Sequence, residues 1–238
     1  MIENAIKLPS SSAYINVPAN TRYDGLTTWS ILATVRNIVT NTGAVIIKGV
    51  AASNNRRLSF QIFGISPTVL QVVMDRATTD LDYRSNSFTT LANVPMVIAA
   101  TVDTGGSAGD LVRFYRKTGN SALVLTGNAT ATNGSGAFQS DAGSAVPVLN
   151  NAASTNGSTL HLYNQIVVSN VRLTQKEIAD FALNPFKKVR GTIYRSFLAA
   201  NGRNKVIDIS GFAGHGTLTN SAAPITAIYP SIDRSTDY

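Results

Sequence analysis

The sequence predicts an all-β protein, a two-sheet antiparallel sandwich that carries one short helix. Stretches of alternating apolar and polar residues recur along the chain, and clusters of Gly, Asn and Ser separate them. Only the stretch 167–186 has a long run of helical character. With 238 residues, 44% of them hydrophobic, the chain is large enough for a full core. No repeat with a period of about 20 to 50 residues is evident, which argues against a propeller or a solenoid.

The helix is predicted over residues 174–183. Thr174 is a natural N-cap, and Glu177 three residues later completes a capping box. Apolar residues then recur at helical spacing along one narrow stripe, which we expect to face the core. Asn184 precedes Pro185, a pairing that disfavours continuation of the helix. The helix is therefore short, and strands are predicted on both sides of it.

The segment around this helix carries a family pattern. S-N-V-R-L-T at residues 169–174 is followed by the helix and then by N-P-F at residues 184–186. This resembles the closing segment of laminin-G-like domains, which belong to the concanavalin A-like lectins and glucanases. Val171 and Arg172 stand where that family has Arg and Ala. The resemblance implies a two-sheet antiparallel jelly roll.

Strands are predicted at the spacing typical of a sandwich. They cover residues 13–17, 29–36, 44–50, 57–63, 69–75, 97–102, 111–117, 122–126, 146–149 and 159–168. The pair that brackets the loop 103–110 resembles a hairpin of the same family, with Tyr115 in a matching place. Trp29 lies on an alternating face and is expected in the core rather than against a sugar. The stretch 127–143, rich in small and polar residues, is predicted to be a long surface excursion.

The end of the chain carries a second family pattern. Residues 205–220, K-V-I-D-I-S-G-F-A-G-H-G-T-L-T-N, resemble a motif D-x-S-G-N-G-N-H-G-T-L-T-N that family members have near their beginning. We therefore predict one domain, in which 1–186 is the laminin-G-like jelly roll. Residues 187–238 supply strands at 191–199 and 216–219. These strands complete a circularly permuted jelly roll or pair with a neighbouring subunit, and a flexible tail is the alternative.

Charge and composition limit the possible partners and the location of the protein. The net charge is +7, and the six basic residues between Lys187 and Lys205 are accompanied by no acid. Apolar residues interrupt them, so a strand with solvated basic edges is favoured over a specific nucleic-acid site. There is no Cys, no recognisable signal peptide and no apolar run near about 18 residues. We therefore predict a soluble protein that is made in the cytoplasm and binds no membrane.

Catalytic and metal-binding patterns are sparse. A glucanase of this class needs paired glutamates, because retaining cleavage uses two carboxyl groups about 5 Å apart. The chain has only Glu3 and Glu177, so we predict no enzyme activity. With two His and no Cys, the usual zinc site is excluded. Calcium is possible, with Asp103 and Asp110 flanking a Gly-rich loop as weak candidates, and no other cofactor is predicted.

A glycan site is predicted around Asp80, Asp82, Tyr83 and Arg84, in which the two aspartates alternate on one strand face. A solvated edge is the alternative reading of the same four residues. The predicted function comes from the resemblance, because laminin-G-like modules are widespread in tailed-phage structural proteins. We predict a non-enzymatic virion protein (head decoration, head fibre or tail-associated) that contacts itself, other virion proteins and possibly a glycan. A carbohydrate-binding module or adhesin outside a virion is the runner-up, and a glycosidase comes third.

Overall fold

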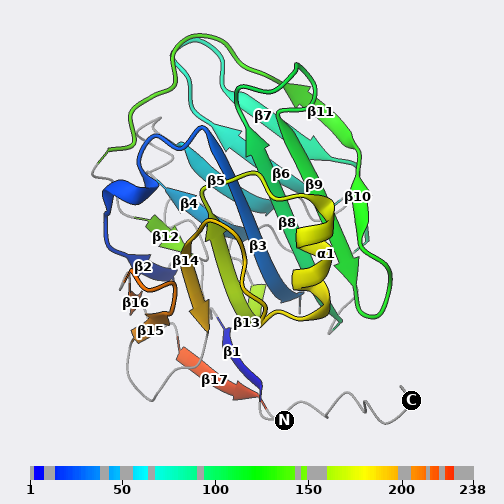
Figure 1. Cartoon of the computed structure of the whole chain (residues 1–238), viewed down its shortest axis with the longest axis vertical. Coiled ribbons are helices and arrows are strands. Elements are labelled where there is room, and N and C mark those ends of the chain that lie inside the picture. The colour runs from blue at the N-terminus through cyan, green and yellow to red at the C-terminus, as the bar shows by residue number, and fades with distance from the viewer. Residues whose placement is uncertain are drawn as a thin grey trace.

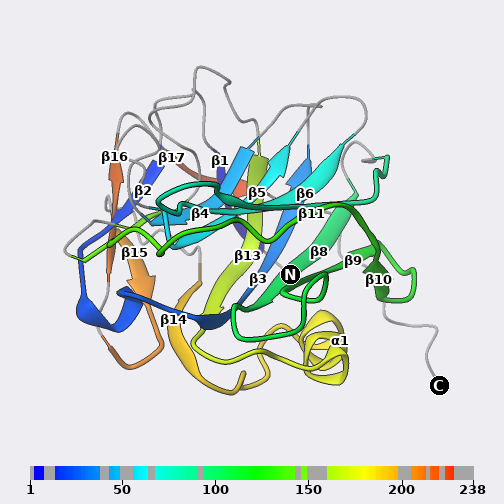
Figure 2. The same ribbon diagram turned by 90° about the horizontal axis from the view of Figure 1, so that it is seen from above.

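The computed structural model describes residues 3–7, 14–37, 43–48, 56–63, 68–89, 94–142, 146–148, 160–197, 205–212, 215–219 and 223–227. These residues form seventeen β-strands, one α-helix and one short 3-10 helix, η1 (Thr21–Tyr23). Every strand pairing among them is antiparallel. Two such sheets pack face to face, so the predicted all-β jelly-roll sandwich is confirmed (Figures 1 and 2).

The first sheet, sheet A, has its longest strands at its centre. Its order is β10 (Val124–Thr126), β9 (Val112–Thr118), β8 (Pro95–Asp103), β3 (Thr28–Asn37), β13 (Leu160–Ser169), β14 (Thr192–Phe197) and β15 (Lys205–Asp208). The first half of β13 also pairs with β1 (Glu3–Lys7), which in turn pairs with β17 (Ala223–Ala227). Segments from both ends of the chain therefore complete this sheet.

The second sheet, sheet B, faces sheet A across the core. Its order is β11 (Asn128–Thr132), β7 (Leu81–Ser85), β6 (Val69–Met74), β5 (Leu58–Phe63), β4 (Gly43–Lys48), β12 (Val146–Val148), β2 (Tyr14–Val17) and β16 (Gly216–Thr219). Strand β15 pairs with β14 of sheet A and with β16 of sheet B. It therefore joins the two sheets at one edge.

The main core lies between the sheets and follows the predicted alternation. In β3, Trp29, Ile31, Ala33 and Val35 all point into this core, and Trp29 is 0% exposed. The other face of β3 is also buried, because Leu32 belongs to a second apolar cluster outside sheet A. The expectation that Trp29 is a core residue is confirmed.

Helix α1 (Gln175–Leu183) covers the outer face of sheet A, as Figure 2 shows. Its predicted capping box is present, because Thr174 Oγ1 accepts from the Glu177 backbone N–H and the Glu177 carboxylate accepts from Thr174 N–H at 2.7 Å. Ile178 and Phe181 pack with Leu32 in the second cluster. The helix therefore fills one outer face of the sandwich, and the outer face of sheet B lies on the opposite side.

The tail contains strands at the positions predicted for it. The strand expected at 191–199 is β14, and the strand expected at 216–219 is β16; both pair within the same chain. Asp208 of the D-x-S-G motif accepts hydrogen bonds from Arg195 N at 3.1 Å and from Ser210 N at 2.8 Å. The motif is thus a turn that fastens the segment after β15 to β14. Residues 228–238, to which the flexible-tail alternative also applies, lie outside the described residues.

The excursion predicted at 127–143 is partly wrong. Its first part forms β11, which pairs with β7 and extends sheet B. Further on, Phe138 is held between two arginines, whose guanidinium carbons lie 4.5 Å (Arg57) and 4.1 Å (Arg76) from its ring centre. Gly134 lets the backbone approach residue 79 too closely for any side chain. The ring of Phe138 and the close backbone contact at Gly134 hold this polar stretch against the sandwich.

Candidate functional site

A row of polar side chains crosses the outer face of sheet B. The inward residues of β5, β6 and β7 belong to the core, so the alternate residues face outward. Gln61 lies directly opposite Gln71, which lies opposite Arg84 on the next strand. Asp82, two residues before Arg84, lies on the same face. We call Gln61, Gln71, Asp82 and Arg84 the polar ladder.

The members of the polar ladder are joined by hydrogen bonds. Gln61 Nε2 donates to Gln71 Oε1, and Gln71 Nε2 donates to Asp82 Oδ1 at 2.8 Å. Arg84 donates to Asp82 through Nη2 at 2.7 Å and through Nε at 3.3 Å. Both glutamine amides donate in the same direction, towards the Asp82 carboxylate. Hydrogen bonds in such a chain polarise one another, so each bond is strengthened by its neighbour. The result is a fixed array of planar polar groups across three strands.

Within the polar ladder, exposure increases from Gln71 to Asp82 and Arg84. Gln71 is 4% exposed, whereas the side chains of Asp82 and Arg84 are 24% and 39% exposed. The buried amide holds the carboxylate in position from one side, and the guanidinium holds it from the other. Carboxylate, amide and guanidinium groups fixed in this way are suited to pair with ligand hydroxyl groups, because such sites fix orientation with a few placed polar groups.

The four residues predicted as a glycan site do not act as one group. Asp82 and Arg84 lie in the polar ladder. Tyr83 points into the core at 0% exposure, donates to Asn133 Oδ1, and has its pKa raised by burial. Asp80 lies just before β7 and accepts from Arg76 N at 3.0 Å. Alternation along β7 turns Tyr83 inward and removes it from any direct contact with a ligand on this face. Asp80 is separated because it belongs to the turn before the strand.

The weak calcium candidates are engaged elsewhere. Arg113 makes a bidentate bond to Asp110, with distances of 2.6 and 2.8 Å, and Arg172 approaches the same carboxylate at 3.3 Å. These contacts, led by the hydrogen bond from Arg113, lower the pKa of Asp110. Asp103 caps its own turn by accepting from Gly105 N. Within the part of the chain that the structure describes, no group of three or more His, Cys, Asp or Glu could hold a metal ion.

Other residues considered from the sequence are also placed. Tyr115, which matches the family hairpin, is 2% exposed and lies in the second apolar cluster with α1, so it cannot stack on a sugar. His215 is exposed, and its Nδ1 accepts from Asp208 N at 3.1 Å. The side chains of His161 and Tyr163 lie outside the described residues. The two glutamines of the polar ladder were missed, although both alternate with the apolar residues that marked β5 and β6 as strands.

Comparisons with known proteins support the fold. No protein-family model matches the chain, and no curated protein matches it. A proposed carbohydrate-binding protein from Bacteroides ovatus has a similar structure, with a TM-score of 0.57 and 14% identity; the similarity covers 97% of this chain and 62% of that one. This chain therefore spans less than two thirds of the length of that protein.

Two further structures are more distant. A heptameric SAP-like pentraxin from Limulus polyphemus has a TM-score of 0.48 and 13% identity, covering 85% of this chain and 97% of the pentraxin. A GH43 protein from Bacillus licheniformis has a TM-score of 0.34 and 13% identity, covering 57% and 26%. The strand pairings and the similarity to the Bacteroides ovatus structure together support an all-β jelly-roll sandwich. Among the described residues, no helix is long and apolar enough to cross a membrane.

Proposed function

We propose that this protein is a non-enzymatic carbohydrate-binding protein, and that it binds its glycan on the polar ladder of sheet B. The observation that carries this proposal is the hydrogen-bonded chain that fixes the partly exposed Asp82 between Gln71 and Arg84 on the outer face of sheet B. Because these side chains are already held in position by one another, little binding free energy would be spent on ordering the site. The similarity to the Bacteroides ovatus protein agrees with this class of function but shows only the fold.

The arrangement favours binding over catalysis. Both oxygens of Asp82 already accept hydrogen bonds from the polar ladder. Asp80 accepts a backbone N–H in a separate turn, so the two aspartates belong to different networks. A glycosidase instead needs two carboxyl groups that flank the same bond, one of which is able to donate a proton. We therefore propose that Asp82 orients a sugar and does not transfer a proton to it.

The test is binding of the full-length chain to a glycan array, followed by calorimetry with the strongest ligand. Replacement of Asp82 by Ala should weaken binding about tenfold or more, because it leaves Gln71 and Arg84 without their shared acceptor. Asp110→Ala is the matched control, since it removes another Arg-bonded aspartate, in the loop that joins β8 and β9 of sheet A. Absence of any glycan ligand, equal losses in both variants, or cleavage of the bound glycan would refute the proposal.

We also propose a virion setting, with contacts to other virion proteins and to further copies of the chain. The virion setting is supported only by a sequence resemblance, that of the closing segment and the tail motif to modules of tailed-phage structural proteins. None of the three structures described above is named as a virion protein. Mass spectrometry of purified particles from the source tests it: stoichiometric presence is expected, and absence would leave an adhesin outside a virion.

A further inference from the structure

Strand β10 is an edge strand of sheet A. Among the described strands it pairs only with β9, and it lies at the right-hand rim of the molecule in Figure 1. Val124 and Leu125 are each 47% exposed, although alternation sends their side chains to opposite faces of the strand. An edge strand presents a row of backbone N–H and C=O groups with which a further strand can pair.

This edge lacks the features that usually prevent such pairing. Natural edge strands are protected by charged residues, by proline or by a bulge. Residues 118–140, which include β10 and β11, contain no charged residue and no proline, although 14% of the whole chain is charged. Strand β11, at the edge of sheet B, has a bulge between Asn128 and Thr130, whereas the register of β10 with β9 is continuous. Of these two edge strands, β10 is therefore the unprotected one.

The sequence of β10 is complementary to a second copy of itself. Leu123, Val124 and Leu125 read the same in both directions. When two copies pair antiparallel about Val124, Leu125 of each copy lies opposite Leu123 of the other. Leu125 shares the outer face of sheet A with Tyr115, its neighbour on β9, and Leu123 already packs against the second apolar cluster. The pairing would therefore bring the second apolar clusters of the two copies together.

Charge does not oppose this contact, although the chain has a net charge of +7. The basic residues of β9, which are Arg113, Arg116 and Lys117, lie one strand behind the edge. Three strand spacings, about 14 Å, would separate the backbones of the two β9 strands, and this exceeds the screening length of about 8 Å at physiological salt. A charged partner, in contrast, would find no opposite charge on β10.

We propose that β10 pairs antiparallel with β10 of a second copy and thereby joins two sandwiches into a symmetric dimer. Identical antiparallel strands are related by a two-fold axis perpendicular to the sheet, so both copies face the same way. The two polar ladders would then lie on one side of the dimer. If each polar ladder binds a glycan, as proposed above, the dimer gains avidity for a glycan-covered surface. The avidity rests on that proposed function, whereas the pairing does not.

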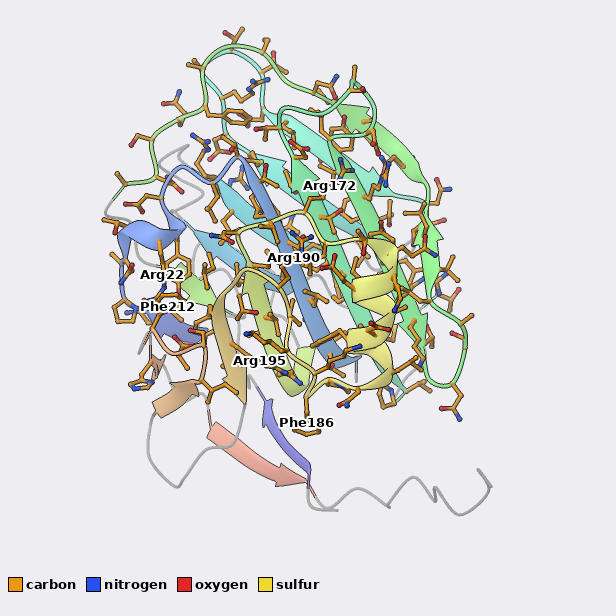
Figure 3. The ribbon with its side chains drawn as sticks, viewed as in Figure 1. Arg22, Arg172, Phe186, Arg190, Arg195 and Phe212 are labelled. Carbon is orange, nitrogen blue, oxygen red and sulfur yellow. The ribbon has the colours of Figure 1, made fainter. Side chains whose placement is uncertain are left out.

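Analytical ultracentrifugation of the full-length chain, at concentrations up to about 1 mM, tests the pairing, because so short a contact belongs to the weak class of interfaces. The unchanged chain should pass from monomer to dimer as its concentration rises. Val124→Lys should raise the dissociation constant about tenfold or more, since like charges would lie directly opposite each other. Ile209→Lys is the matched control, because Ile209 is 44% exposed and lies in the turn that contains Phe212. Figure 3 shows Phe212 on the far side of the molecule from β10.

A mixture of two variants tests the register. Val124→Lys and Val124→Glu chains should each associate poorly alone, and their equimolar mixture should recover the dimer, because position 124 lies opposite itself in the proposed pairing. Circular dichroism checks that each variant is folded. A chain that stays monomeric over the whole series, equal losses in Val124→Lys and Ile209→Lys, or no recovery in the mixture would overturn the pairing. None of these measurements involves a glycan, so they distinguish failure of the pairing from failure of the glycan-binding proposal.

Discussion

Replacement of Asp208 by Ala tests whether the tail is part of the fold. Asp208 is 5% exposed, and its carboxylate accepts from Arg195 N, from Ser210 N and from Ser210 Oγ at 2.9 Å. The guanidinium of Arg22 lies 3.7 Å away, with its side chain 13% exposed. Asp208→Ala would therefore leave one buried backbone donor without an acceptor and one largely buried cation without this counter-charge.

The structure allows an estimate of the cost. A buried N–H without its acceptor costs about 2 kcal/mol, and loss of the counter-charge beside Arg22 adds about 1 kcal/mol. Ser210 is only partly buried, so water can replace its bonds. A total of about 3 kcal/mol corresponds to a fall in Tm of about 6 to 12 °C for a chain of this size.

Differential scanning calorimetry of the full-length chain measures this fall. Asp208→Asn keeps one oxygen acceptor and should lose less than Asp208→Ala. Asp110→Ala, at a carboxylate whose side chain is 42% exposed, should change the free energy of unfolding by less than about 1 kcal/mol. If Asp208→Ala melts within about 2 °C of the unchanged chain, the tail turn does not contribute to the stability of the sandwich and the reasoning fails.

Three further predictions concern helix α1 and the loop that contains Gly134. Hydrogen bonding to Arg190 lowers the pKa of Glu177 from 4.5 to about 2, so its stabilisation is present above pH 4.5 and disappears as the pH falls through about 2; Glu177→Gln should lower Tm at pH 7 but not at pH 2 in thermal circular dichroism. Phe181→Ala should cost about 3 to 5 kcal/mol in urea unfolding, because Phe181 is 1% exposed under α1; a loss below about 1 kcal/mol would mean that the helix is not docked. Gly134→Ala should destabilise by more than about 1 kcal/mol, since its Cβ would lie 2.4 Å from Thr79 O at a positive φ of 70°; an unchanged urea midpoint would contradict the close approach.

The fold was largely predictable because its signals are local. Alternation located β5, β6, β8 and β9, and the capping box located α1 to within one residue. Strand β11 could not be found in this way, because the only apolar residues that alternate in N-A-T-A-T are alanines, which give a weak strand signal. It is a strand because it pairs with β7 at the edge of sheet B, a long-range interaction that the local sequence does not encode.

The site was only half predictable for a related reason. Asp82 and Arg84 could be predicted because charged residues are uncommon in strands and suggest a site. Tyr83 was grouped with them, although a residue between two outward residues of a strand points inward, as Tyr83 does. The glutamines carry no charge, and their importance depends on register. Gln61 and Gln71 meet only because β5 and β6 pair at that position. Sequence alternation predicts which face a residue occupies but not which residue lies beside it.

The most direct test of the glycan-binding account is a side-chain amide and guanidinium NMR titration of the full-length chain with its strongest array ligand. The account predicts that the side-chain signals of Gln61, Gln71 and Arg84 shift together and saturate with the affinity measured by calorimetry. It also predicts that Arg113, on the outer face of sheet A, stays unchanged. Shifts confined to sheet A or to helix α1, with the polar ladder unaffected, would contradict it.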